Sequence, residues 1–167
     1  MRYSAEEIFQ MAESVEREGA RFYRLAAKNS ENAETKAFFN RLADWETRHE
    51  KLFAALRSDL PHAARHEDGP GDPIEEHAAD YLRAFVDGKV FPHPPRLADS
   101  GESITADPVK ALEFALGREK DTIILFLTLQ EQVPKYWGRE KVQQIVAEEL
   151  KHVHMIEGQL RDIADRR

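Results

Sequence analysis

Residues 37–57, AFFNRLADWETRHEKLFAALR, and residues 140–160, EKVQQIVAEELKHVHMIEGQL, decide the fold of this chain. In both segments apolar residues recur every three or four positions, which is the spacing of one face of an α-helix. A Glu-x-x-His pair interrupts the apolar face of each segment: Glu46 with His49, and Glu149 with His152. The pattern predicts two amphipathic helices that direct an acid and an imidazole into the protein core.

The two segments belong to an internal repeat. Three acidic and imidazole residues recur 103 positions later in the chain: Glu16, Glu46 and His49 as Glu119, Glu149 and His152. Tyr23 and Phe126 match at the same offset, as do Leu42 and Ile145. The first glutamate of each set also interrupts an apolar face of its own predicted helix. A duplicated helical hairpin explains all of these matches.

Capping residues, turn residues and prolines divide the chain into helices. They predict helices at about residues 4–28, 33–57, 72–86 (a short one), 107–133 and 139–163. No segment alternates polar and apolar residues as a β-strand does. We therefore expect an all-α single domain over residues 1–167. It is a four-helix bundle of two hairpins, about residues 4–57 and 107–163, joined by a long crossover at about 58–106.

Composition restricts the class of protein. Of the 167 residues, 41% are hydrophobic and 33% are charged, as in a soluble globular domain with one core. The net charge of -7 argues against a nucleic-acid partner, which would need a basic surface. The chain shows no signal peptide and no membrane span, so we expect a cytoplasmic protein with no membrane partner. Because cysteine is absent, disulfides and thiolate-bound metal clusters are excluded.

The six repeated acidic and imidazole residues are predicted to meet in the middle of the bundle. In each hairpin the two glutamates are centred on the turn, about 22 Å away from it, so they reach the same level. Four buried carboxylates without compensating charge would be very costly. Two divalent cations would cancel that charge, and the Glu-x-x-His spacing places an oxygen and a nitrogen ligand side by side. The sequence thus predicts a two-metal site, and a self-satisfied hydrogen-bond cluster is the alternative.

At these residues the chain resembles the rubrerythrin branch of the ferritin-like superfamily. The resemblance covers both hairpins and rests on four motifs: residues 16–23 (EREGARFY), 46–52 (ETRHEKL), 119–121 with Phe126, and 148–152 (EELKH). It implies a ferritin-like four-helix bundle with a non-haem di-iron site that reacts with peroxide or dioxygen. It also implies that Glu46 and Glu149 bridge the metals, while Glu16 and Glu119 are terminal or switching ligands and each histidine caps one metal.

The chain departs from the rubrerythrins at three points. They carry an additional glutamate three residues beyond the third-helix ligand, where this chain has Thr122, and a tyrosine in the third helix, where this chain has Phe126. They also carry a cysteine-ligated rubredoxin domain, although this chain has no cysteine. We therefore expect an oxidoreductase that reduces hydrogen peroxide or dioxygen with electrons from an external donor protein. An iron-storage or ferroxidase protein without peroxidase turnover is the alternative. Two iron ions are the expected cofactor, and manganese or zinc suits the same ligands.

Residues near the predicted ligands carry weaker signals. Tyr23 shares a helix face with Glu16, where it would bond a ligand carboxylate, relay an electron in catalysis or simply fill the core. Trp45 and Glu18 are expected to point away from the metals, and Glu148 to lie near a ligand or at the surface. The crossover contains four histidines, His62, His66, His77 and His93. A connection of this length permits exchange of a hairpin between two copies, which predicts a homodimer.

Overall fold

The computed structural model describes residues 5–61, 104–132 and 138–165, and these residues form four long helices. They are α1 (Ala5–Asn29), α2 (Ala33–Ser58), α4 (Pro108–Gln132) and α5 (Arg139–Asp165), and a 3-10 turn, η2 (Ile104–Ala106), precedes α4. These ranges contain no strand, which confirms the all-α prediction. None of the described helices has the length and apolar character that crossing a membrane requires. The expected helix at 72–86 and the four crossover histidines lie outside the described residues. So does most of the long crossover from which the homodimer is predicted.

Local sequence explains where the helices begin. Asn32 precedes α2, and its side-chain oxygen accepts a hydrogen bond from the Thr35 backbone N–H at 2.9 Å. Asp107 caps α4 in the same way, accepting from the Val109 N–H at 2.8 Å. Gly138 precedes α5 with a φ of 104°, a conformation that glycine adopts without strain.

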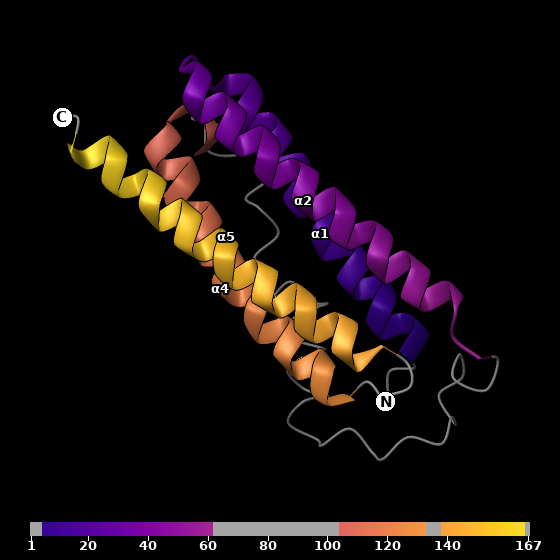
Figure 1. Ribbon diagram of the computed structural model, residues 1–167. Helices are drawn as coiled ribbons and strands as arrows, with labels where there is room; N and C mark the ends of the chain where they lie inside the picture. Colours follow the sequence, from indigo (N-terminus) through magenta and orange to yellow (C-terminus); the bar gives the residue numbers. More distant parts are fainter. Residues whose placement is uncertain (1–4, 62–103, 133–137, 166–167) are drawn as a thin grey trace.

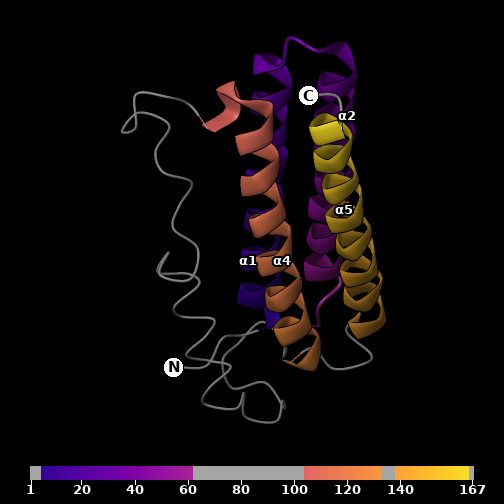
Figure 2. The ribbon, with the colours of Figure 1, turned by 90° about the vertical axis from the view of Figure 1, so that its left-hand side faces the viewer.

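The two hairpins lie side by side and run in opposite directions (Figure 1, Figure 2). The turn between α1 and α2 lies at one end of the bundle, whereas α4 ends and α5 begins at the other end. Each helix is about 38 Å long, so a level about 22 Å from either end lies near the middle. The opposite orientation of the hairpins therefore brings the two halves of the predicted site to the same height.

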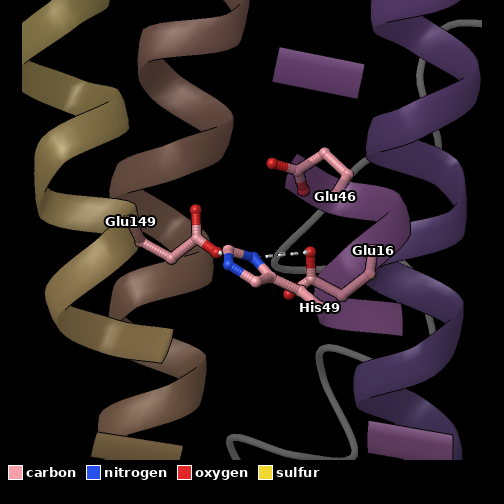
Figure 3. A group of neighbouring side chains, drawn as sticks. All are labelled: Glu16, Glu46, His49 and Glu149. Carbon is pink, nitrogen blue, oxygen red and sulfur yellow. Dashed lines mark ion pairs between the residues drawn. The ribbon is translucent and has the colours of Figure 1, made fainter. Parts of the chain in front are cut away.

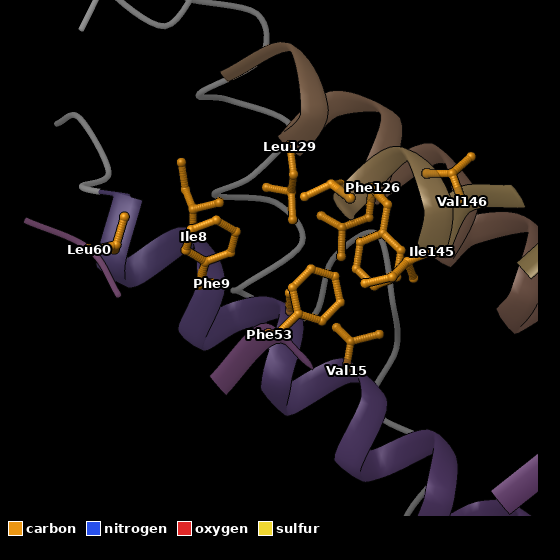
Figure 4. Packing of buried hydrophobic residues seen from close by; sticks show 12 residues of the cluster. Ile8, Phe9, Val15, Phe53, Leu60, Phe126, Leu129, Ile145 and Val146 are labelled. Carbon is orange, nitrogen blue, oxygen red and sulfur yellow. The ribbon is translucent and has the colours of Figure 1, made fainter. Parts of the chain in front are cut away.

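Two apolar clusters fill the bundle on either side of the predicted metal ligands. The first cluster, drawn in Figure 4, includes Phe9, Val15, Phe53, Phe126 and Ile145. The second includes Tyr23, Phe39, Leu42, Leu112 and Ile156. On every helix the predicted ligands fall between the residues that enter the first cluster and those that enter the second. Apolar packing therefore excludes water from both sides of the site along the bundle axis.

Candidate metal centre

The six predicted ligand residues meet in the middle of the bundle. Each helix supplies one glutamate, and α2 and α5 each add a histidine: Glu16, Glu46, His49, Glu119, Glu149 and His152. None of the six is more than 4% exposed. Figure 3 shows four of them pointing toward one another from α1, α2 and α5. The structure thus brings together every residue of the predicted site.

The ligand atoms form two overlapping groups, which are called here the His49 position and the His152 position. The His49 position consists of Glu16, Glu46, His49 and Glu149, and the His152 position of Glu46, Glu119, Glu149 and His152. Within each group the ligand atoms lie within 4.8 Å of one another. Glu149 serves both, because its Oε1 lies 2.7 Å from His49 Nδ1 and its Oε2 lies 2.8 Å from His152 Nδ1. Glu46 also belongs to both groups, so the geometry suits two cations with two shared carboxylates.

The polar atoms of this site do not satisfy one another. Both carboxylate oxygens of Glu16 and of Glu149 are buried without a hydrogen-bond partner among the described residues, and so is Nδ1 of each histidine. The 2.7 Å separation of His49 and Glu149 is short, yet its geometry is not that of a hydrogen bond. Buried polar atoms that converge without bonding need another partner. This favours cations over a self-satisfied hydrogen-bond cluster, and the mixed carboxylate and imidazole donors fit iron.

A fifth buried glutamate shows how an acid is satisfied here without a metal. Glu13, which is 4% exposed, accepts two N–H bonds from the Arg57 guanidinium, one of them at 3.1 Å. The sequence reasoning missed this pair, because the spacing of Glu13 along α1 does not distinguish it from a ligand. What distinguishes Glu13 from the ligand glutamates is its ion pair with Arg57 on the neighbouring helix, α2.

Burial and crowding change the ionisation of the ligands. Burial, reinforced by the charges of Glu46 and Glu149, raises the pKa of Glu16 well above its ordinary value, and the same causes raise the pKa of Glu119. Burial alone would lower the pKa of His152, but contacts of its ring with Glu119, Glu149 and Glu46 outweigh this effect and raise its pKa to about 12. In the absence of metal, protons therefore take the place of cations.

Tyr23 contacts a ligand directly, and Glu18 does not. The Tyr23 hydroxyl donates a hydrogen bond to Glu119 Oε1, as one of the expectations for this residue had it, and its ring also fills the core in the second apolar cluster. Glu18 lies at the surface in an ion pair with Arg21, as expected.

Glu148 and Trp45 each touch a ligand histidine of the other hairpin. Glu148 Oε2 lies 2.9 Å from His49 Nε2, so the expectation that Glu148 lies near a ligand is confirmed. Trp45 packs against the second apolar cluster, as expected, and its ring also stacks on His152 with the centroids 5.0 Å apart. The residue before Glu46 lies on the flank of α2 that meets α5. Helix periodicity alone does not reveal that neighbour.

Gly19 makes room for the shared carboxylate of Glu46. A Cβ added at Gly19 would lie 2.9 Å from Glu46 Oε2, so the carboxylate would have to move. We expect Gly19→Ala to weaken both metal positions by about tenfold, as displacing an orienting neighbour does. Alanine is the better helix former by about 1 kcal/mol, but the displacement of Glu46 offsets part of that gain, so the apo protein should be stabilised by less than this amount. Titration calorimetry and thermal melting measure the two effects.

Gly117 provides the matched control for that substitution. It is also helical, on α4, and an added Cβ would meet nothing within 4 Å. Gly117→Ala should raise apo stability by the full amount of about 1 kcal/mol and leave metal affinity unchanged. Unchanged affinity in Gly19→Ala would show that Glu46 does not bind metal in the observed conformation.

Comparisons with known proteins agree with this geometry. Residues 4–70 match the Rubrerythrin family model. The whole structure is similar to a crystal structure described as that of a ferritin-like diiron-carboxylate protein from Thermotoga maritima, with a TM-score of 0.66 and 21% sequence identity over 96% of this chain and 97% of that one. No curated protein matches the chain significantly. The chain is thus rubrerythrin-like in its first hairpin and has a ferritin-like fold, which confirms the resemblance inferred from its sequence.

Proposed function

We propose that this protein is a di-iron carboxylate oxidoreductase that reduces hydrogen peroxide or dioxygen with electrons from a separate donor protein. The observation that carries the proposal is the pair of overlapping groups of unsatisfied, buried ligand atoms that share Glu46 and Glu149. Ferritin-like di-metal proteins have a defined ligand pattern: one glutamate comes from each of two helices, and a Glu-x-x-His pair comes from each of the other two. The rubrerythrin and ferritin-like similarities point in the same direction.

The described residues have distinct roles in this proposal. An iron pair bound here would supply the two electrons that reductive cleavage of an O–O bond requires. Glu46 and Glu149 would be shared by the two ions. Tyr23 orients the Glu119 carboxylate through its hydrogen bond. Burial, together with the charge of Glu119, raises the pKa of Tyr23 well above its ordinary value, so the phenol keeps its proton and remains a donor.

A hollow between α1 and α4 supports a small oxidant as the substrate. Its lining includes Gly19, Tyr23, Glu46, Glu119 and Thr122, so it reaches ligands of both metal positions. Gly19 has no side chain and Thr122 has a short one, which leaves space beside the carboxylates. Peroxide and dioxygen are small enough for such a passage. Each cycle consumes two electrons, so a separate donor is required for every further cycle, and it must reach the site directly because this chain has no cysteine to hold an iron–sulfur relay.

Stopped-flow mixing tests the proposal. Anaerobic protein loaded with two ferrous ions per chain is mixed with hydrogen peroxide or with dioxygen, and the absorbance of ferric iron is followed. We expect both oxidants to react, peroxide faster by a modest margin, and turnover to stop after one cycle without a reductant. Faster oxidation by dioxygen would favour the ferroxidase or iron-storage function. Inertness to both oxidants would contradict the oxidoreductase proposal and leave a metal-binding role.

A further inference from the structure

The internal repeat is broken at the residues that touch the two histidines. At the 103-residue offset that relates the hairpins, Trp45 corresponds to Glu148. Both contacts cross between hairpins: Glu148 of α5 reaches His49 of α2, and Trp45 of α2 stacks on His152 of α5. Equivalent places beside the two imidazoles therefore hold a carboxylate in one half and an indole in the other.

The Glu148 contact orients His49 as a metal ligand. Nε2 of His49 lies 2.9 Å from Glu148 Oε2, whereas Nδ1 faces Glu149 at 2.7 Å and Glu16 at 3.6 Å. A carboxylate accepts hydrogen bonds, so Nε2 carries a proton, and Nδ1 is the nitrogen that is left to bind a cation among the ligand oxygens. This contact fixes both the tautomer and the ring orientation, and it strengthens Nδ1 as an electron donor to a cation.

His152 has a different kind of neighbour. The rings of Trp45 and His152 stack with an interplanar angle of 22° and their centroids 5.0 Å apart. Stacking restrains the orientation of the imidazole. An indole, however, has an N–H donor and no acceptor oxygen, so it does not strengthen His152 as Glu148 strengthens His49.

A second break in the repeat acts in the same direction. Tyr23 corresponds to Phe126 at the same offset, and a phenylalanine ring has no hydroxyl to donate. Tyr23 donates its hydrogen bond to Glu119, the terminal carboxylate of the His152 position. This bond occupies one oxygen of Glu119, whereas both oxygens of Glu16, the corresponding carboxylate of the His49 position, have no hydrogen-bond partner among the described residues. The His152 position therefore combines a carboxylate that shares one oxygen with a phenol and an imidazole that stacks on an indole.

We infer that the two cation positions are inequivalent: the His49 position binds a divalent metal more tightly and fills first, with Glu148 as its positioning residue. The inference rests on the proposed two-metal centre and adds an order of filling to it. Each half of the repeat supplies the same ligand types, two glutamates and one histidine. The order in which the positions fill therefore follows from the neighbouring residues that differ between the halves.

An anaerobic titration with Co²⁺ tests the inference without any turnover. Calorimetry and visible absorption should resolve two unequal binding steps in the wild-type protein. Glu148→Ala should weaken the tighter step by about tenfold, the lower end of the range for groups behind a ligand, because the Glu148 side chain is 49% exposed. Glu148→Gln should lose less affinity, because its amide oxygen accepts the same hydrogen bond. The weaker step should stay unchanged in both variants.

Three further variants assign the steps and control for charge. His152→Ala should retain the tighter step, and His49→Ala the weaker one. Glu18→Ala is the matched control. Like Glu148, Glu18 is about half exposed (46%) and lies close to a ligand in the sequence, but its carboxylate pairs with Arg21 and not with a ligand histidine. It removes the same negative charge and should change neither step. Thermal melting of each apo variant verifies that the fold is kept.

The outcomes separate this inference from the proposed function. Two equal steps in the wild type, an equal loss in both steps of Glu148→Ala, or the same loss in Glu18→Ala would overturn the inference and leave the two-metal centre standing. Uptake of fewer than two Co²⁺ per chain by the wild type would overturn both.

Discussion

Replacing Glu149 by alanine is expected to abolish the binding of both metal ions, whereas replacing His49 or His152 should remove one. The two carboxylate oxygens of Glu149 lie 2.7 Å and 2.8 Å from Nδ1 of the two histidines, so a single side chain serves both positions. Elemental analysis after reconstitution and dialysis measures the result as metal per chain. We expect two ions in the wild type, one in each histidine variant and none in Glu149→Ala.

Glu13 provides the control for loss of a buried acid. It is as buried as the ligands but is paired with Arg57, so Glu13→Ala should lower stability and keep both metals. Retention of one ion by Glu149→Ala would show that Glu149 is not shared between the two positions.

Metal binding is expected to raise the melting temperature, and by more at about pH 8 than at about pH 6. A ligand that binds only the folded state at 100 times its dissociation constant adds about 2.7 kcal/mol per site. For a protein of this size that is about 5–10 °C per site. The increment grows with pH because protons compete with cations for the same carboxylates and imidazoles.

The apo protein should lose stability over the same pH range. Folding raises the pKa of Glu16 and Glu119 above an ordinary 4.5, and that of His49 and His152 above an ordinary 6.5. Above those values the folded state holds more protons than the unfolded chain, so its free energy of unfolding falls as the pH rises. Glu149 has a lowered pKa, because its contacts with the two histidines outweigh its burial, and its effect is confined to pH values below 4.5.

Calorimetric melting with and without Mn²⁺, which is stable to air, measures both pH effects. The variant with glutamine at all four ligand positions, Glu16, Glu46, Glu119 and Glu149, is the control. It should be more stable than the apo wild type at the higher pH and indifferent to metal. An increment from metal that does not change with pH would mean that protons do not occupy the ligand site in the apo protein.

Most of the fold and the composition of the candidate site were predictable from local signals. Asn32, Asp107 and Pro108 mark helix starts through their own side chains and backbone, so the predicted bounds lie close to the observed ones. The spacing of apolar residues shows which face of each helix is buried. The 103-residue repeat then predicts that Glu16 and Glu119 lie at the level of the two Glu-x-x-His pairs.

The sequence by itself therefore determined the helices, their inner faces and the set of six candidate ligands, because each depends on spacing within a helix or on the repeat between hairpins. Tertiary structure alone decided which side chains meet across helices. It places Glu149 between both histidines, Glu148 on His49, Trp45 on His152 and Arg57 on Glu13. The physical reason is that these contacts depend on how the flanks of neighbouring helices face one another. A period of 3.6 residues describes a single helix and contains no information about its neighbour.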